Sequence, residues 1–430
     1  MKKLLIIMVA AILTVAPIFA NGAKEAAPAA DDNGPKTITV WCWDPAFNIP
    51  VMEEAGRRYT EAHPEVTFNI VEMAKADVEQ KIQTILASGT KDGLPDICLV
   101  EDYNVQKYVT YYPGSFVDLS DDFNFDDFSS YKTSIGTFDG GQYSFPFDSG
   151  VAGLFYRTDM LEEAGITAAD LENITWDEFC DLGEKYTAKT GKFFLAGDPS
   201  DGGFFRMMLQ SSGKWYFDKD GNVDVKNNEA LAQAIKIYKR MYNESFRKPT
   251  SGWTEWVSAI NTGDVPTITS GVWIMGSIRQ AEDQAGLWDV APVPRLDVSG
   301  SVNASNLGGS SWCVLENGKQ KNEAIKFLQE TFASDADFYQ TILVNQGAVG
   351  SYKEAITGSA YSANNEFFSN KPIFETMGQW STQIPMVNVG LFTYDADAAV
   401  MANIQDYYDG KATLETTLDK IDSQLRNAML

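Results

Sequence analysis

The sequence predicts an α/β protein of two domains, each a mostly parallel sheet flanked by helices. Between residues 37 and 100, β-rich runs alternate with stretches at helical spacing in the order strand, helix, strand, helix, strand. Such alternation is typical of parallel strands joined by right-handed helical crossovers. The chain of 430 residues is also long enough for two domains with cores of their own. Its hydrophobic content of 44% indicates a globular protein.

Local patterns predict where the strands and helices lie. The run TITVWCW follows a Gly-Pro break, and the helix after it ends at His63, because a residue before proline disfavours helical geometry. Ser88 and Gly89 end the next helix. The strands are expected at 37–43, 66–71, 96–100 and 151–156, and the helices at 50–63, 78–87, 159–165, 228–244, 321–334, 395–408 and 413–429.

A further helix is predicted directly after Thr175. The threonine side chain can accept a hydrogen bond from the backbone three residues later, and Glu178 stands at that third position. This pattern is a capping box, which satisfies two otherwise unpaired N–H groups at the start of a helix. We therefore expect Thr175 to be the residue that caps this helix.

The first twenty residues predict a secretory signal peptide. Two lysines precede an apolar run over residues 4–16, which is too short to cross a bilayer. Ala20, or alternatively Ala23, is the expected cleavage site. Residues 21–35 are rich in alanine, proline and aspartate and predict a flexible leader. We expect an exported protein, and no lipid-anchored terminus because no cysteine lies near the cut.

Charge and histidine content limit the functional classes. The chain has 59 acidic and 34 basic residues, a formal net charge of −25, which disfavours nucleic acid and anionic membranes as partners. The only histidine, His63, stands beside Pro64 at a helix end, which argues against a serine triad or an HExxH zinc site. Gly271 and Gly276 have phosphate-loop spacing, but Ser277 stands where lysine is required. Neither an enzyme nor a metal site is expected.

Two further patterns leave alternatives open. Oxygen-bearing residues between Asp218 and Glu229 have the spacing of a calcium loop, but Val223 stands where that loop needs glycine, and a β-hairpin is favoured. The four cysteines form no CxxC pair, so we expect buried free thiols. A disulfide between Cys42 and Cys98 stays open, because an exported protein can form one.

Several segments together carry a resemblance to a known family. The most informative is SFPFDSGVAGLFYRTDMLEEAGI at 144–166. The others are ITVWCWD at 38–44, YTEAHPEVTFNIVEM at 59–73, LASGTKDGLPDICLVED at 86–102, NTGDVPTITSGVWIMGS at 261–277, WDVAPVPR at 288–295, GGSSWCV at 308–314 and EAIKFLQE at 323–330. In order and spacing they resemble the extracellular solute-binding proteins of ABC importers, the maltose-binding-like carbohydrate family. The resemblance indicates a broad family and not a particular ligand.

This resemblance implies a two-lobed periplasmic-binding-protein fold with a ligand cleft between the lobes. Residues 36–148 and 301–346 would form the N-terminal lobe, and 149–300 and 347–430 the C-terminal lobe, with hinges where the chain crosses. The implied function is that of a monomeric periplasmic protein, without a cofactor, that captures a mono- or oligosaccharide and delivers it to the permease of an ABC transporter. A secreted carbohydrate-acting enzyme and a sensory ligand-binding protein of a chemoreceptor remain alternatives.

Sugar chemistry indicates which side chains would line that cleft. Aromatic rings cover the apolar faces of a pyranose, while carboxylates and amides bind its hydroxyl groups. Such side chains follow the predicted strands or occupy positions that the resemblance places near the ligand. The predicted ligand-binding residues are Trp43, Asp44, Glu101, Tyr103, Asn104, Asp148, Ser149, Asp198, Trp273, Trp312 and Tyr394, and further candidates are Trp41, Trp215, Trp253, Trp256 and Trp380. Strand alternation predicts that Trp41 and Trp43 face one way and Cys42 the other.

Overall fold

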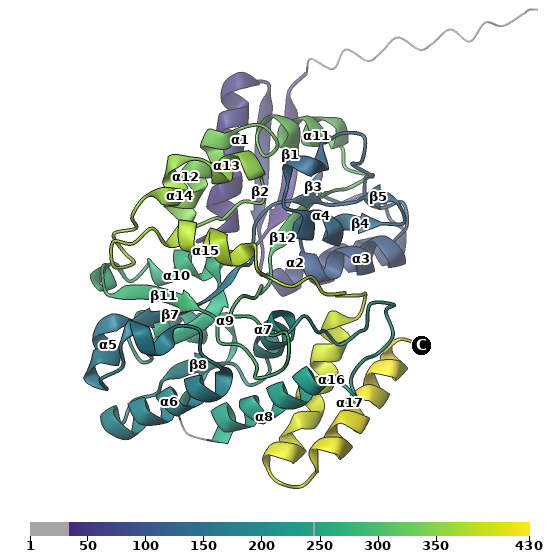
Figure 1. The fold of residues 1–430 in the computed structure, drawn as a ribbon. Coiled ribbons are helices and arrows are strands. Elements are labelled where there is room, and N and C mark those ends of the chain that lie inside the picture. The colour runs from purple at the N-terminus through teal and green to yellow at the C-terminus, as the bar shows by residue number, and fades with distance from the viewer. Residues whose placement is uncertain (1–33, 244–245) are drawn as a thin grey trace, which may run out of the picture. The chain divides into compact units, whose positions relative to one another are not determined.

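The computed structural model describes residues 34–243 and 246–430. The predicted signal peptide and most of the predicted leader, residues 1–33, lie outside the described residues. Residues Lys36–Leu430 form one structural unit, whose elements are labelled in Figure 1. Within the described ranges, no helix combines the length and the apolar character needed to span a bilayer.

The first of two large sheets has the strand order β2-β1-β3-β12-β6 (Figure 1). β1 pairs in parallel with β2 and β3, whereas β12 runs antiparallel to β3 and β6. The sheet thus joins the N-terminal part of the chain to a strand that comes more than two hundred residues later. Its strands are β1 (Lys36–Cys42), β2 (Val66–Glu72), β3 (Ile97–Glu101), β6 (Phe145–Pro146) and β12 (Ser310–Val314).

Helices cover both faces of the first sheet. Cys42 packs in the core cluster on one face and Trp41 in the cluster on the other, which confirms their predicted opposite orientation. Trp43 contacts both clusters. The first cluster contains side chains of α1 (Asn48–Ala62), α11 (Lys321–Glu330), α12 (Ala336–Gln346) and α13 (Lys353–Ile356), and the second contains side chains of α2 (Lys75–Ser88) and α3 (Asp102–Tyr111).

The second sheet has the strand order β11-β7-β10-β8-β9. β7 lies between β11 and β10 and is antiparallel to both, while β8 is parallel to β10 and β9. Every residue of β7, β10 and β11 is buried, because helices lie on both sides. The strands are β7 (Ala152–Arg157), β8 (Leu195–Gly197), β9 (Arg247–Pro249), β10 (Thr267–Gly271) and β11 (Trp288–Pro292).

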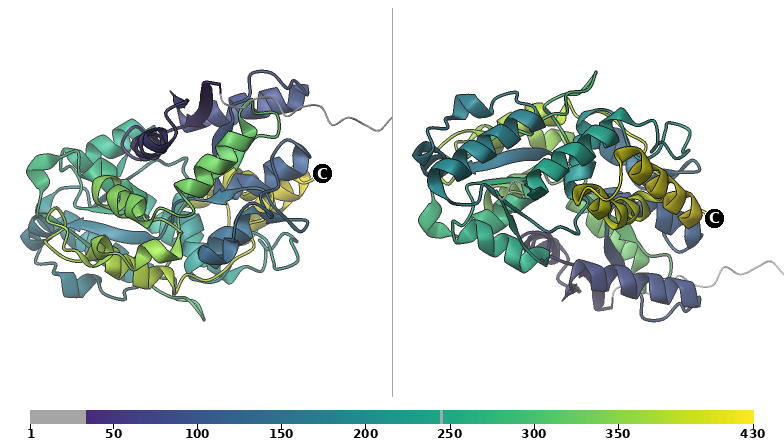
Figure 2. Two further views of the ribbon diagram at one scale, coloured as in Figure 1. Left: turned by 90° about the horizontal axis from the view of Figure 1, so that it is seen from above. Right: turned by 90° about the horizontal axis from the view of Figure 1, so that it is seen from below.

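The helices around the second sheet form two separate core clusters. The views in Figure 2 show helices on both faces of the blue strand β7. One cluster contains side chains of α5 (Thr158–Glu163), α6 (Trp176–Thr190), α7 (Gly203–Ser211), α8 (Glu229–Asn243), α16 (Thr393–Tyr408) and α17 (Leu414–Ala428). The other contains side chains of α9 (Gly252–Asn261), α10 (Met275–Ile278), α12, α14 (Ser359–Ser362) and α15 (Ile373–Ser381).

The α/β class and the predicted elements are confirmed, with differences in strand direction and in the ends of some helices. The helix predicted at 321–334 ends at Glu330. In each sheet two of the four strand pairings are antiparallel, so the sheets are mixed and not mostly parallel as predicted. The physical reason is that β12 and β7 each lie between two strands of their sheet and run antiparallel to both of them. α2 also begins three residues before its predicted start. The remaining short elements are α4 (Ser130–Gly136), β4 (Thr137–Phe138), β5 (Gly141–Gln142) and 3-10 turns at Phe125–Asp127, Ala168–Leu171, Val272–Ile274 and Glu282–Gln284.

The predicted capping box at the start of α6 is confirmed. Thr175 Oγ1 accepts a hydrogen bond from the Glu178 N–H at 3.2 Å, and Glu178 Oε2 accepts one from the Thr175 N–H at 2.7 Å. These bonds lower the pKa of Glu178 because they favour its charged form. The helix therefore begins at the residue that the sequence indicates.

The pattern that resembles a calcium loop is a β-hairpin turn. Phe217 pairs with Val223 in an antiparallel bridge. Asp218 Oδ1 accepts hydrogen bonds from the backbone N–H groups of Asp220 and Asn222, each at 2.9 Å. In the described part of the chain, no group of three or more His, Cys, Asp or Glu residues could hold a metal. The favoured hairpin interpretation is confirmed.

The disulfide between Cys42 and Cys98 that the sequence left open does not form. The register of β1 and β3 places Cys98 opposite Trp41, so Cys42 and Cys98 project from opposite faces of the sheet. None of the four cysteines forms a disulfide, and all four are buried. Burial raises the pKa of the Cys42 thiol to about 12, which keeps it protonated at neutral pH.

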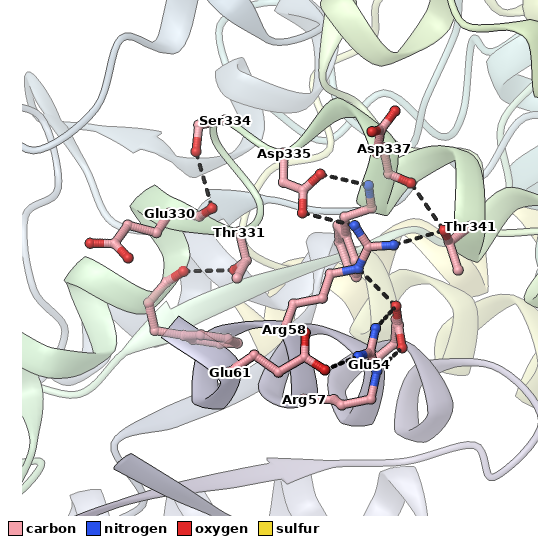
Figure 3. A network of polar contacts seen from close by, with 12 residues as sticks. Glu54, Arg57, Arg58, Glu61, Glu330, Thr331, Ser334, Asp335, Asp337 and Thr341 are labelled. Carbon is pink, nitrogen blue, oxygen red and sulfur yellow. Dashed lines mark hydrogen bonds and ion pairs between the residues drawn. The ribbon is translucent and has the colours of Figure 1, made fainter. Parts of the chain in front are cut away.

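A polar network fastens α1 to the start of α12 on one face of the first sheet. Figure 3 shows Arg58 of α1 between Glu54 of the same helix and the residues Asp335 and Thr341. The Arg58 guanidinium donates to Asp335 Oδ2 at 2.9 Å, while Asp335 Oδ1 accepts from the Phe338 N–H at 2.8 Å as the cap of α12. One carboxylate thus caps a helix and joins it to another.

Replacing this carboxylate should destabilise the protein measurably. Asp335→Ala removes the cap and the ion pair together, which should lower the free energy of unfolding by about 1–2 kcal/mol. Glu61→Ala is the matched control, because Glu61 pairs with Arg57 only at an exposed surface. Its expected effect is below about 0.5 kcal/mol. Urea unfolding followed by circular dichroism measures both, and equal effects would contradict this role of Asp335.

Candidate functional site

A pocket of about 240 Å³ opens at the second sheet, and three tryptophans line it. Its walls come from the end of β8, from β10 and from the first residues of α7 and α9. The lining residues are Gly197, Asp198, Asp201, Gly203, Phe204, Met207, Gly252, Trp253, Trp256, Thr269, Trp273 and Leu307. We call this the tryptophan pocket. Of the predicted site residues, it contains Asp198 and Trp273.

The three rings form a continuous aromatic surface. The Trp253 ring centroid lies 5.7 Å from that of Trp273 and 5.4 Å from that of Trp256. Trp273 Nε1 donates to the Leu307 carbonyl at 2.9 Å, which fixes the plane of its ring. Trp253 is 46% exposed, so a large apolar surface faces the solvent here. Such a surface suits the flat apolar face of a ring-shaped ligand.

Two carboxylates stand beside these rings. Asp198 Oδ1 accepts from the Ser200 N–H at 2.8 Å, and its Oδ2 accepts from the Gly252 N–H at 2.7 Å, so it joins the loop after β8 to the start of α9. Burial alone would raise the pKa of Asp198, but these hydrogen bonds lower it. The Asp201 side chain is 62% exposed; its Oδ1 accepts from the Gly203 N–H at 2.9 Å, and its carboxylate can accept further hydrogen bonds from a ligand.

A second polar wall lies beyond Gly308. Lys75 donates to Glu101 Oε2 and, at 3.3 Å, to Tyr394 Oη. A methyl group added at Gly308 would lie 3.5 Å from Trp273 Nε1 and 3.8 Å from Glu101 Oε1, so Glu101 and the Trp273 ring both lie close to Gly308. Glu101 at the end of β3 thus lies close to the Trp273 side of the pocket, and Lys75 joins it to Tyr394 at the start of α16.

Tyr394 and Tyr103 enclose a buried arginine next to the same pocket. The Arg206 guanidinium lies 5.3 Å from the centroid of the Tyr394 ring and 5.5 Å from that of Tyr103. It also donates to Asp397, which accepts a second bond from Tyr216 Oη at 2.7 Å. Burial raises the pKa of Asp397, while the Arg206 charge opposes that rise. This cluster holds one positive charge without exposing it to solvent.

The remaining predicted residues lie in the first sheet or at its edge. Trp312 is fully buried against the Phe147 and Phe332 rings. Asp148 accepts from the Ser310 N–H at 2.6 Å and from its hydroxyl at 2.8 Å, which joins β12 to the crossing segment. The Asp148 carboxylate is therefore satisfied within the protein, whereas Trp312 is buried with its Nε1 unpaired.

Three further predicted residues make local contacts of the same kind. Ser149 Oγ accepts from Tyr131 Oη at 2.6 Å, and Asn104 Nδ2 donates to Glu79 at 3.0 Å. Asp44 has φ of 64° and accepts from the Ala46 N–H at 2.9 Å, so it shapes the turn after β1. Burial raises its pKa. Trp43, the last of the set, is partly buried between the two clusters of the first sheet.

Several side chains around the pocket were absent from the predicted set. Trp253 and Trp256 were only further candidates, because the ten tryptophans of the chain cannot all line one cleft. Arg206 stands in the otherwise apolar helix GFFRMML, and a lone charge in such a helix is a signal that could have found it. Lys75 and Asp201 lie in polar surroundings and gave no comparable signal.

Comparison with known proteins identifies relatives over most of the chain. The family described as bacterial extracellular solute-binding protein matches residues 54–376. A lactose-binding protein of Rhizobium radiobacter is 48% identical over 387 residues, which cover 90% of this chain and 92% of that protein. An arabinooligosaccharide-binding protein of Bacillus subtilis is 24% identical over 341 residues, 76% of each chain.

Solved structures share the fold. The binding protein of an ABC transporter from B. animalis subsp. lactis, in complex with beta-1,6-galactobiose, superposes with a TM-score of 0.77 at 20% identity and covers 91% of this chain and 96% of its own. The GacH receptor of Streptomyces glaucescens has a TM-score of 0.76 at 18% identity and covers 91% and 98%. The predicted two-lobed binding-protein fold is confirmed by these matches. The chain belongs to the bacterial extracellular solute-binding protein family.

Proposed function

We propose that this protein is the substrate-binding component of an ABC importer and that it captures a carbohydrate in the tryptophan pocket. The observation that carries the proposal is the stacked surface of Trp253, Trp256 and Trp273 beside the carboxylates of Asp198 and Asp201. Rings bind the apolar faces of a sugar and carboxylates bind its hydroxyl groups. The similarity to a lactose-binding protein makes lactose, or a related short galactoside, the first ligand to test.

The ligand would contact two lobes that close on it. We assign the first sheet to one lobe and the second sheet to the other, with Glu101 and Tyr103 of the first lobe opposite the tryptophans of the second. The proposed lobes follow the predicted segments, except that Tyr352 and Ala355 pack in the core of the first sheet, so the second lobe resumes after about residue 356.

Three crossing segments would form the hinge between these lobes. Asp148 pairs with Gly350 and Val151 with Asn306 in isolated bridges, so the segments run beside one another. A hinge is a small set of such residues that absorbs changes in φ and ψ. Ligand would shift the equilibrium toward the closed form by the difference between its affinities for the two forms.

We also propose that the protein is exported to the periplasm and acts there as a monomer. It would deliver its ligand to a membrane permease. Binding without chemistry agrees with the position of the only histidine. His63 lies at the end of α1, where Nε2 is 2.6 Å from a carboxylate oxygen of Glu330. Two alternatives to this function are a secreted carbohydrate-acting enzyme and a sensory ligand-binding protein, and experiments have to distinguish them from a transport protein.

Titration with sugars tests the ligand class. Tryptophan fluorescence should change on addition of lactose, because Trp253 lines the pocket and is exposed, and the change should saturate. Maltose and an arabinooligosaccharide serve as comparison ligands, and an amino acid and a polyamine as negative controls. If only a negative control changes the fluorescence, the assignment to carbohydrate is wrong.

A further inference from the structure

A lysine and an aspartate from different proposed lobes form an ion pair outside the tryptophan pocket. Lys107 Nζ donates to Asp395 Oδ2 at 2.8 Å, and the two side chains are 27% and 32% exposed. Lys107 belongs to α3, in the proposed first lobe, and Asp395 belongs to α16, in the proposed second lobe. We call these two residues the interlobe ion pair.

Each partner of the interlobe ion pair is anchored to its own sheet. Tyr108 and Val109 of α3 pack in a core cluster of the first sheet. Ala396 and Val400 of α16 pack in a core cluster of the second sheet. The two charged groups are therefore carried by two different cores, and a change in the angle between the lobes changes the distance between the charges.

The interlobe ion pair is linked to the ligand site without being part of it. Asp395 follows Tyr394, whose hydroxyl group accepts from Lys75 at 3.3 Å and whose ring centroid lies 5.1 Å from Lys75 Nζ. Lys75 also donates to Glu101, which lies close to the Trp273 side of the tryptophan pocket. Neither residue of the ion pair lines that pocket. A ligand in the pocket therefore does not touch the pair.

Such a pair acts on binding through the position of the lobes. An interaction that exists when the lobes meet and is lost when they separate favours the form that encloses the ligand. A partly exposed ion pair changes an equilibrium constant by at most about fivefold. Salt weakens this effect, because the Debye length falls from about 10 Å at 0.1 M to about 3 Å at 1 M ionic strength.

We propose that the ion pair of Lys107 and Asp395 is a latch that holds the lobes together over the ligand and makes the affinity for a neutral sugar depend on ionic strength. This inference rests on the proposed function and deepens it, since it assigns part of the affinity to residues outside the pocket. Both proposed lobes carry a net negative charge. Their general repulsion is also screened by salt, but that screening strengthens binding, whereas screening of the latch weakens it.

The variant Lys107→Met tests the proposal with lactose as the probe. Methionine removes the charge but keeps an apolar side chain near the Phe392 ring, which lies 5.7 Å from Lys107 Nζ. At low salt the Kd of the variant should be about two- to fivefold higher than that of the wild type. In about 1 M sodium chloride the two Kd values should agree, because salt screens the attraction that the variant lacks.

Lys226→Met is the matched control. Lys226 pairs with Asp419 at 2.8 Å, the same distance as in the interlobe ion pair, but both residues belong to the proposed second lobe. The control therefore changes the net charge of the protein by the same amount and breaks no contact between the lobes. Its Kd for lactose should equal that of the wild type at low and at high salt.

Exchange of the two charges separates the ion pair from other roles of these side chains. Lys107→Glu places two carboxylates together and should raise the Kd at low salt above that of Lys107→Met. The double variant Lys107→Glu, Asp395→Lys restores an attraction between the lobes and should recover most of the wild-type affinity. A side chain that acts only through packing would not be rescued in this way.

The outcomes distinguish the latch from the function on which it rests. Failure of the wild type to bind any sugar overturns the proposed function. If the wild type binds lactose and Lys107→Met binds it equally well at low salt, the latch is overturned while the function stands. A loss of affinity that persists in about 1 M salt, or that the exchanged pair does not repair, also overturns the latch, because Lys107 then acts through something other than its charge.

Discussion

Trp253→Ala should weaken sugar binding about thirtyfold, a loss of about 2 kcal/mol, and leave the folded protein as stable as before. The ring is 46% exposed and lies at the centre of the aromatic surface, between Trp256 and Trp273. Its removal takes away a stacking contact with the ligand but little buried core. Isothermal titration calorimetry with lactose gives the Kd, and a thermal melt gives the Tm.

An exposed ring elsewhere provides the control for this variant. Tyr111 is 53% exposed at the end of α3, so Tyr111→Ala removes a similar surface away from the pocket. Its Kd should equal that of the wild type. Trp273 is a less direct target, because its Nε1 bond to Leu307 also holds a strand connection in place. An unchanged Kd for folded Trp253→Ala would exclude the tryptophan pocket as the binding site.

Lys132→Met should cost about 3–5 kcal/mol of stability, the usual loss when one partner of a buried ion pair is removed. Lys132 Nζ donates to Asp102 Oδ2 at 2.5 Å and to the Ser310 carbonyl at 2.9 Å, and neither charged side chain is more than 1% exposed. The substitution keeps the volume of the side chain but leaves the Asp102 carboxylate buried without its cation. Urea unfolding at pH 7 measures the loss.

The same variant has a predicted pH dependence. Burial raises the pKa of Asp102, with the nearby Lys132 charge acting against that rise. Loss of the cation raises the pKa further, so the folded variant holds a proton at pH values where the unfolded chain has released it. Its stability should therefore recover as the pH falls from 7 toward 5, and decline again as the pH rises through the folded-state pKa.

A surface ion pair gives the comparison for Lys132. Lys192 pairs with Glu163 at 3.0 Å, and both side chains are about half exposed. Lys192→Met should change the free energy of unfolding by no more than about 1 kcal/mol, without a marked recovery at low pH. If Lys132→Met behaves in the same way, the ion pair between Lys132 and Asp102 does not stabilise the first sheet.

The sequence predicted most elements of the fold because local signals agreed with the tertiary structure. The capping box at Thr175 and the strand β1, which ends at Cys42 within the run TITVWCW, are examples in which one short pattern determines one element. The antiparallel entry of β12 could not be predicted in this way, because it depends on pairing between residues about two hundred positions apart. No local pattern records such a contact.

The site was predictable only in part, for the same reason. Trp273 and Asp198 follow strands and could be placed from the resemblance, and both line the pocket. Trp253 stands on a helix, where its exposure depends on the loop that Asp198 holds. Trp312 follows a Gly-Gly turn that suggested a cleft position, but it faces the core of the first sheet. Which side of an element faces the ligand depends on packing far along the chain.

Native mass spectrometry of the full chain with lactose tests the central claim most directly. The account predicts a complex with one lactose per protein, and recovery of the intact disaccharide after long incubation and release. The Trp253→Ala protein under the same conditions should show much less complex. Absence of a complex, or release of glucose and galactose at catalytic rates, would contradict the conclusion that this protein captures a carbohydrate and delivers it unchanged.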